Sequence, residues 1–443
     1  MTIFTIFGLI LIVYAFVNYK KSFILFLIFR LFLNQNINLI NLPGIPLLTL
    51  EFTLCFLFFC IFLIRQPRLY IDKSKFPLTK PFILIISSCF LSTFFGIAGL
   101  SNSIFNFIKV IFENYISIWL IWVLLKEKKD FTFLIRGVTI VCLFAGIYGL
   151  YEAFTHTNPL MDYEISIAGT GDRVIDWNYE DDIYRGYRIK SIFIHAIGAG
   201  INWGLSSLVI FYLYFFNRGS LFKKYTFFFL TASLLLTCLF FTNSRAQIVF
   251  LLIGLIPLIN LKKYKSYDLL AFTAIILVGI YFFNSSYFEN IFSIFNKHAQ
   301  ENIGGSNFEM RLMQLYAAFQ IASAYPILGI GLKGLAYYPN QILVEALLGL
   351  ESMWFKIIVE QGILGVLTTL YLMYVLIIKL GLKTHNRPVL FLSLAYFITY
   401  SMTSVPGFAT YLLYTFIFMF YKFNQKSNIE NQLRDVVFTR VKE

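Results

Sequence analysis

Charged residues are scarce in this chain, and their scarcity excludes most soluble folds. They make up 13% of the 443 residues, against about 25% in typical soluble domains. Hydrophobic residues account for 58% and aromatic residues for 19%, with 52 phenylalanines among them. A soluble core has too little volume to bury so much apolar surface. The composition therefore indicates a protein that lies in a membrane.

The apolar runs contain few turn signals and lack the polar–apolar alternation of a membrane β-barrel, which leaves helices as the elements that cross the bilayer. We predict an all-α, polytopic transmembrane bundle of roughly 12 or 13 spans, because a helix needs about 20 apolar residues to cross a bilayer. The whole of 1–443 is predicted to form one integral membrane domain. The predicted spans are 3–18, 22–35, 47–64, 82–99, 104–125, 131–152, 192–216, 225–241, 246–261, 269–284, 362–379, 389–404 and 406–421.

The N-terminal stretch lacks the basic leader and the small-residue cleavage site of a signal peptide, so we expect it to form the first span. Cysteine is rare, and all five cysteines lie within apolar runs. We interpret them as small hydrophobic residues and expect neither a disulfide nor a metal site. No cofactor is predicted.

Lysine and arginine gather in short loops such as "RQPRLYIDKSKFPLTK" and "KEKKD", which alternate with connections nearly free of them, such as "GLSNS". Because basic loops stay on the cytoplasmic side, the net charge of +13 indicates membrane topology and not nucleic-acid binding. The C-terminal tail, 422–443, then lies inside. The two longest connections, 153–191 and 285–361, fall on the outer face, and long loops in a compact protein are usually functional.

Three arginines are predicted at this outer rim. Arg188 stands just before a span, Arg245 lies between two apolar runs in "FFTNSRAQIVFLLIGL", and Arg311 lies early in an amphipathic helix predicted over 307–325. Arg188 and Arg311, taken alone, are also explained as interfacial arginines that extend their charged ends to water. Together the three arginines favour a phosphate-bearing substrate, because the planar guanidinium makes bidentate contacts with phosphate.

The remaining charged residues of interest can also be explained by structure alone. Lys333 lies in "GIGLKG", a glycine-rich stretch typical either of a phosphate-binding loop or of a helix end. Arg30 and Glu51 lie in neighbouring spans, and Lys109 and Glu113 stand four apart, so we expect ion pairs within each couple. The four histidines show neither metal-ligand nor catalytic-triad spacing, and we interpret them as incidental.

Four stretches resemble the O-antigen ligase and O-antigen polymerase (Wzy-type) family. They are "YRIKSIFIHAIGAG", "TNSRAQIVFLLIGL", "RLMQLYAAFQIASAYPILGIGLKGL" and "ESMWFKIIVEQGILGVLTTLYL", and their order and spacing agree with the family over residues 185–380. The resemblance implies a GT-C-like, metal-independent glycosyltransferase. It also implies that the substrate is an undecaprenyl-pyrophosphate-linked glycan and that the active face is the periplasmic or extracytoplasmic side of the bacterial inner membrane.

The resemblance further implies roles for single residues. Arg188, Arg245 and Arg311 would hold the substrate pyrophosphate, with Lys333 as a further contact, and Arg245 would also stabilise the leaving group. Ligases of the family carry a histidine just before the Glu-x-Gly segment, whereas this chain has Glu351 there. We therefore expect Glu351 to activate the acceptor hydroxyl or, alternatively, to pair with an arginine.

These expectations favour a polymerase of lipid-linked repeat units for O-antigen, capsule or exopolysaccharide. Its partners would be the undecaprenyl-pyrophosphate-linked glycan, membrane lipids and a chain-length regulator protein. One alternative is a ligase that transfers the glycan to another acceptor. The other is a flippase or transporter of lipid-linked oligosaccharide, but transporters tend to carry internal repeats and polar groups near the midplane, whereas the polar groups here gather at one face.

Overall fold

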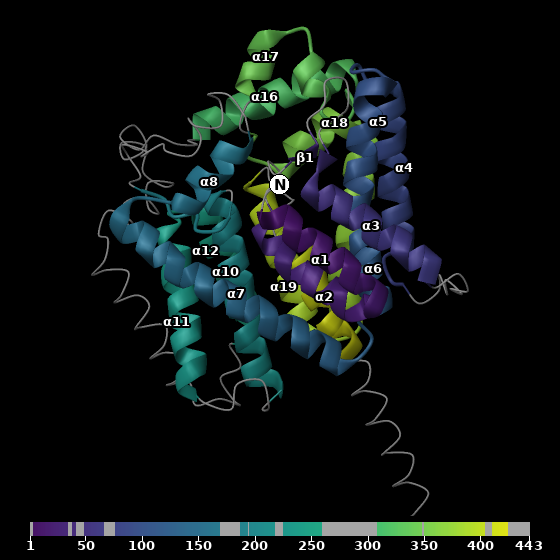
Figure 1. Ribbon diagram of the computed structural model, residues 1–443. Coiled ribbons are helices and arrows are strands. Elements are labelled where there is room, and N and C mark those ends of the chain that lie inside the picture. Colours follow the sequence, from purple (N-terminus) through teal and green to yellow (C-terminus); the bar gives the residue numbers. More distant parts are fainter. Residues whose placement is uncertain are drawn as a thin grey trace, which may run out of the picture.

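The computed structural model describes residues 3–33, 38–40, 48–65, 76–168, 187–193, 195–217, 225–258, 308–347, 350–403 and 410–423. Nearly all of this part of the chain is helical (Figure 1), which confirms the predicted all-α class. Four of the described helical stretches are long and apolar enough to cross a membrane: Ser103–Leu124, Lys128–Thr155, Ala196–Leu213 and Met353–Leu382. The protein is therefore a multi-pass membrane protein.

In its described residues, the first half of the chain contains eight α-helices, two short strands and two helical stretches of other types. They are α1 (Ile3–Val17), α2 (Tyr19–Phe29), a 3-10 turn η1 (Arg30–Phe32), strands β1 (Asn38–Ile40) and β2 (Leu48–Thr49), α3 (Leu50–Arg65), α4 (Thr79–Phe95), α5 (Leu100–Val110), a π-helical stretch η2 (Ile111–Ile116), α6 (Ser117–Leu124), α7 (Lys128–Thr155) and α8 (Pro159–Ala168).

The second half contains the segments that resembled the family. Its elements are α10 (Ala196–Asn217), α11 (Tyr225–Phe241), α12 (Arg245–Leu255), η3 (Ile256–Leu258), α16 (Phe308–Ala324), η4 (Gly334–Tyr337), α17 (Gln341–Ala346), α18 (Met353–Tyr374), a π-helical stretch η5 (Val375–Leu382) and α19 (Arg387–Ser401). Residues 410–423 form a further helix.

The predicted spans coincide with helices wherever the chain is described, apart from shifts at their ends. The predicted span 269–284 lies outside the described residues, so the predicted number of spans stays a prediction. The antiparallel pair of β1 and β2, in which Asn38 faces Thr49, was not predicted. These strands are only a few residues long, too short to show an alternating pattern.

Two predicted ion pairs are confirmed inside the bundle. Arg30 contacts Glu51 at 2.6 Å, and Lys109 contacts Glu113 at 3.8 Å. Arg30 also donates to the Glu113 carbonyl at 2.8 Å and lies 4.4 Å from the ring centre of Tyr411. A charge buried among apolar helices must be paired in this way, and the arginine thereby joins η1 to α3, η2 and the helix 410–423.

The start of α18 differs from the prediction. The predicted span began at residue 362, but the helix begins at Met353 and is kinked at Gly362, which has φ 61°. The backbone N–H groups that follow the kink donate to the carbonyls of Pro326 (2.9 Å) and Ile327 (3.2 Å). A Cβ atom at position 362 would lie 2.5 Å from the Ile327 backbone. Glycine is required there because the loop approaches the helix backbone so closely.

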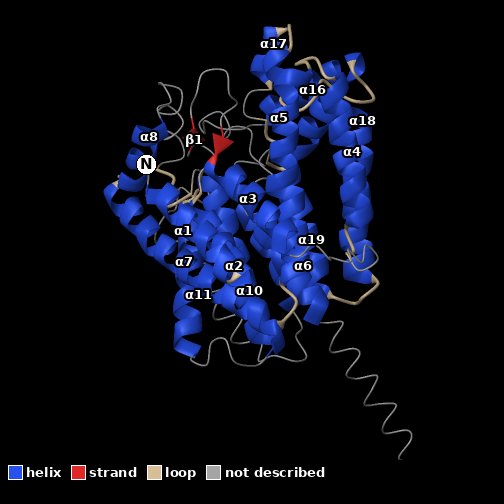
Figure 2. Cartoon of the chain, turned by 45° about the vertical axis from the view of Figure 1, so that its right-hand side comes forward, coloured by secondary structure: helices blue, strands red, loops and turns tan. Residues whose placement is uncertain are grey.

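Helices α16 and α17 cap one end of the bundle, above α18, α4 and α5 (Figures 1 and 2). Helix α16 confirms the helix predicted over 307–325. It packs through Ala317, Ala318 and Ile321, whereas Leu312 and Phe319 of the predicted apolar stripe are 47% and 57% exposed. These two residues therefore lie on a second face of α16, which the described part of the protein leaves exposed.

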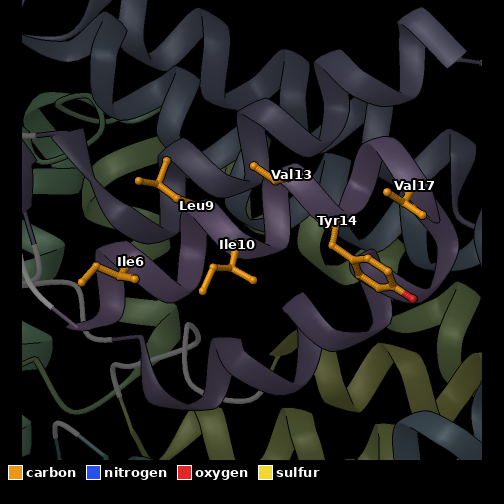
Figure 3. Close-up of a pocket in the computed structure, with 6 residues that line it drawn as sticks. All are labelled: Ile6, Leu9, Ile10, Val13, Tyr14 and Val17. Atoms are coloured by element: carbon orange, nitrogen blue, oxygen red, sulfur yellow. The ribbon is translucent and has the colours of Figure 1, made fainter.

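A shallow apolar groove follows one side of α1 (Figure 3). It is lined by Ile6, Leu9, Ile10, Val13, Tyr14 and Val17. All six residues belong to one helix of the bundle, and none of the predicted site residues contributes to the groove. This apolar surface is what a helix facing lipid presents.

Candidate active site

Arg188 and the turn that precedes Arg245 lie against each other. The Nε of Arg188 donates to the Thr242 carbonyl at 3.0 Å. The backbone on either side is fixed as well, since Ile189 N–H donates to the Phe241 carbonyl at 3.3 Å. Two arginines that are far apart in the sequence are thus carried by neighbouring backbone segments.

The turn between α11 and α12 presents Arg245 at the first position of a helix. Asn243 in this turn adopts a left-handed backbone with φ 48°, which reverses the chain within a few residues. Ser244 precedes the helix but its side chain makes no capping hydrogen bond. The first amide groups of a helix carry a partial positive charge and attract anions. The guanidinium and the helix end therefore favour the same kind of ligand.

Arg311 pairs with Glu351. Its guanidinium lies 3.1 Å from the Glu351 carboxylate, and the two side chains are 37% and 25% exposed. The same Arg311 nitrogen lies 3.5 Å from the Met402 carbonyl. The backbone N–H of Glu351 donates to the Gln314 side chain at 3.1 Å. Helix α16 carries Arg311 and, through Gln314, holds the backbone of Glu351. Both charged side chains remain partly exposed at the protein surface.

The Arg188–Arg245 region and the Arg311–Glu351 pair lie at the same end of the bundle, as contacts of α12, α18 and α19 show. Helix α19 ends beside the start of α18, where the Trp354 indole donates to Ser401 at 2.8 Å, and it packs along α12. The opposite ends of α12 and α19 meet through Tyr212, which donates to the Gly254 carbonyl and lies 5.5 Å from the Phe420 ring. The Phe420 carbonyl in turn accepts from Asn386, which precedes α19. Helices α12 and α19 are therefore antiparallel, and the start of α12 lies near the end of α19.

The glycine-rich loop around Lys333 uses its amide groups within the protein. Ile330 N–H donates to the Val359 carbonyl at 2.9 Å and Gly331 N–H to the Glu360 carbonyl at 3.0 Å. The Lys333 N–H donates to the Glu360 carboxylate at 3.2 Å. The loop thus packs against α18, and what it offers to a ligand is the Lys333 side chain. The role of Lys333 in binding stays a prediction.

The Lys333 ammonium group lies in a positively charged neighbourhood. The residue is exposed, but the protein around its ammonium group displaces water, and this partial desolvation lowers its pKa. The charges of Lys109 and Lys356 lower the pKa further, against the opposing effect of Glu360. Such a cation gains by contact with an anion, which would relieve the repulsion.

His195, which we interpreted from the sequence as incidental, lies close enough to Arg188 for its charge to be felt. Its Nδ1 accepts from the Ile197 backbone N–H at 3.1 Å, at the start of α10. Burial, together with the charges of Arg188 and Lys190, lowers its pKa to about 4. The imidazole is therefore neutral at neutral pH, and its remaining proton is on Nε2 because Nδ1 acts as an acceptor.

The structure also adds residues that sequence reasoning did not single out. Glu152 is 1% exposed and lies beneath the segment that carries Arg188. Gln314 is fully buried and supports Glu351. The sequence offers one signal for Glu152, because an acidic residue at the end of an apolar run is a candidate functional residue. Gln314 had none, because a glutamine in an amphipathic helix is common.

Within the described ranges, no three or more His, Cys, Asp or Glu side chains are grouped closely enough to hold a metal ion. The arrangement instead presents guanidinium groups, a helix N-terminus and one accessible carboxylate. These groups can bind a phosphate-bearing molecule, stabilise negative charge that develops on it and accept a proton beside it.

Residues 230–370 match the model of a family described as O-antigen ligase. This stretch includes Arg245, Arg311, Lys333 and Glu351, and it ends before α19. The match confirms the resemblance to the O-antigen ligase and polymerase family. That family implies a lipid-linked glycan as substrate class. No curated protein matches the chain.

Proposed function

We propose that the protein is a polymerase that joins undecaprenyl-pyrophosphate-linked oligosaccharide units at the outer face of the bacterial inner membrane. The observation that carries the proposal is the placement of Arg188, Arg245 and Arg311 at one end of the bundle, with the accessible carboxylate of Glu351 beside the third of them. We also propose a chain-length regulator protein as a partner.

The arginines would bind the donor pyrophosphate. The acceptor hydroxyl oxygen forms a bond to the anomeric carbon of the donor, while the bond from that carbon to the pyrophosphate oxygen breaks. Undecaprenyl pyrophosphate leaves with the bonding electrons. Arg188, Arg245 and the start of α12 stabilise the charge that grows on it, so the leaving group needs no proton.

Glu351 would receive the proton of the acceptor hydroxyl. Its ion pair with Arg311, at 3.1 Å, weakens it as a base while the site is empty. When pyrophosphate binds Arg311, the guanidinium exchanges the carboxylate for a phosphate oxygen, because both ligands offer the same bidentate geometry. The carboxylate is then available to the acceptor only when donor is bound.

The assignment as polymerase, and not ligase, is supported by Glu351 itself. In the family that this chain resembles, ligases have a histidine just before the Glu-x-Gly segment. The corresponding residues here, 341–352, include no histidine. The competing assignments predict different products when the gene is deleted. A polymerase mutant should attach single repeat units, a ligase mutant should accumulate lipid-linked polymer, and a flippase mutant should retain single units on the inner side.

The test is analysis of surface and lipid-linked glycans in a deletion strain complemented with wild type, Arg245→Ala or Arg136→Ala. Arg136 is an exposed arginine of α7 far from the proposed site, so it controls for the loss of an arginine. We expect polymer with wild type and Arg136→Ala, and single units with Arg245→Ala. Accumulated lipid-linked polymer in the deletion strain would show that the protein is a ligase.

A further inference from the structure

Glu152 is a buried carboxylate near the end of α7. One of its hydrogen bonds is with the Asn158 side chain, and the others come from one short segment. Its Oε2 accepts from the Ser191 N–H at 2.6 Å, and both oxygens accept from the Lys190 N–H, at 3.2 and 3.1 Å. Its Oε1 also accepts from the Tyr187 hydroxyl at 3.1 Å. These donors come from 187–193, the segment that carries Arg188.

The backbone of this segment has the form that binds anions. Ser191 adopts a left-handed conformation with φ 56°, which turns two successive N–H groups toward one point. Such a pair of amides forms an anion-binding concavity, and here Glu152 fills it. Left-handed backbone is unfavourable for a residue other than glycine, whereas hydrogen bonds to a carboxylate are about twice as strong as neutral ones. The carboxylate thus stabilises a backbone that would otherwise relax.

Neutral contacts also fix the same segment to α7 and to the start of α8. Asn158 donates to the Ser191 carbonyl at 2.9 Å, and its side-chain oxygen accepts from the Tyr148 hydroxyl at 2.8 Å. The Ser191 hydroxyl donates to the Ala145 carbonyl at 2.6 Å. The segment therefore rests on α7 and on the start of α8, while the guanidinium of Arg188 reaches the other way, to the turn before α12.

We propose that Glu152 is a positioning residue, which holds the backbone of 187–191 so that the Arg188 guanidinium lies at the α11–α12 turn next to Arg245. The proposal rests on the proposed function in one respect, namely that Arg188 binds the substrate pyrophosphate. Glu152 itself touches no substrate. It acts by supporting the arginine, because a displacement of about 1 Å in a binding group is enough to lower a rate about a hundredfold.

The first arm of the experiment measures geometry and needs no reaction. Hydrogen exchange of the purified full-length protein in lipid nanodiscs is compared for wild type, Glu152→Gln and Asp162→Asn. Asp162 is an exposed carboxylate on α8 near the same corner. We expect faster exchange at 190 and 191 in Glu152→Gln, with α10 and α12 unchanged, and no change in Asp162→Asn. Unchanged exchange at 190 and 191 in Glu152→Gln would overturn the proposal.

The second arm is a double-mutant cycle with Arg188→Lys, measured as the rate of polymer formation from lipid-linked repeat units. Glu152→Gln alone should lower the rate about tenfold or more, as the loss of a hydrogen-bonded charge does. If Glu152 acts through Arg188, adding Glu152→Gln to Arg188→Lys should cost much less than tenfold. A full and independent loss in the double variant would show a general structural role and overturn the proposal.

The outcomes separate this proposal from the proposed function. If wild type forms no polymer, or if Arg188→Lys and Arg188→Ala both keep the wild-type rate, the arginine site of the proposed function is wrong, and the positioning role is overturned with it. If the Arg188 variants lose activity while Glu152→Gln keeps the wild-type rate, the proposed function stands and only the positioning role is overturned.

Discussion

Replacement of Glu351 by glutamine separates a base from a structural ion-pair partner. The carboxylate lies 3.1 Å from the Arg311 guanidinium and is 25% exposed. Glutamine keeps the shape and the hydrogen-bonding oxygen but loses both the charge and the basicity. The backbone contact from Glu351 N–H to Gln314 does not involve the side chain, so it survives the change.

The two roles predict losses of different size. An ion pair between groups exposed to this degree contributes about 0.2–1 kcal/mol to stability, so its loss alone should leave the protein folded. Loss of a general base lowers the rate about 10²- to 10⁴-fold, which corresponds to about 3–5 kcal/mol in the activation free energy. We therefore expect Glu351→Gln and Glu351→Ala to lose at least about a hundredfold in rate, with little change in protein level.

The assay is the rate of polymer formation by purified variants, with thermal unfolding measured on the same samples. Glu345→Gln is the matched control, because Glu345 is an exposed carboxylate of α17 close in sequence to Glu351. If Glu351→Gln kept more than about a tenth of the wild-type rate, the reasoning from base strength would be refuted. If Glu345→Gln lost activity instead, the base would have to be assigned to that residue.

The remaining predictions concern the leaving group, the topology and the neutral histidine. Arg245→Lys should lose most activity, because an ammonium group cannot reproduce the bidentate contact, and the glycan ladder measures this. A single cysteine at Ile342, which is 78% exposed, in an otherwise cysteine-free chain, should react with an impermeant thiol reagent in intact cells. The depressed His195 pKa of about 4, against about 6.5 in the unfolded chain, means that the unfolded state binds the proton first. Stability from this residue is present above about pH 6.5 and is lost as the pH falls toward 4, so His195→Gln should flatten the fall in unfolding temperature over that range.

Each of these predictions has a result that opposes it. Arg136→Lys should keep the wild-type ladder, and a normal ladder with Arg245→Lys would remove Arg245 from the site. Reaction of the Ile342 cysteine only after cell lysis would reverse the orientation, and with it the outer location of the arginines. An unaltered pH dependence in His195→Gln would mean that the fall in stability has another origin.

The helices were predictable because hydropathy alone determines which stretches remain in a membrane. The ion pairs of Arg30 and Lys109 were predictable for a related reason, since an isolated charge in that environment is costly. The kink of α18 was not predictable from local sequence. Gly362 adopts its conformation because Pro326 and Ile327, from a separate segment, occupy the space beside it.

At the candidate site the sequence predicted the components but not their arrangement. Arg188 and Arg245 were expected at one rim, and the hydrogen bond to Thr242 places them on adjoining segments. The Arg311–Glu351 pair was one of two alternatives, and the amide contacts around Lys333 were not foreseen. Contacts between distant segments depend on packing, which residue pattern alone does not specify.

The most direct test of the account is reconstitution of the purified protein with a single lipid-linked species, the undecaprenyl-pyrophosphate-linked repeat unit. A polymerase uses this molecule as both donor and acceptor. The account predicts a ladder of lipid-linked chains with release of undecaprenyl pyrophosphate, and its absence with Arg245→Ala. A product that forms only after a different acceptor is added would contradict the polymerase assignment.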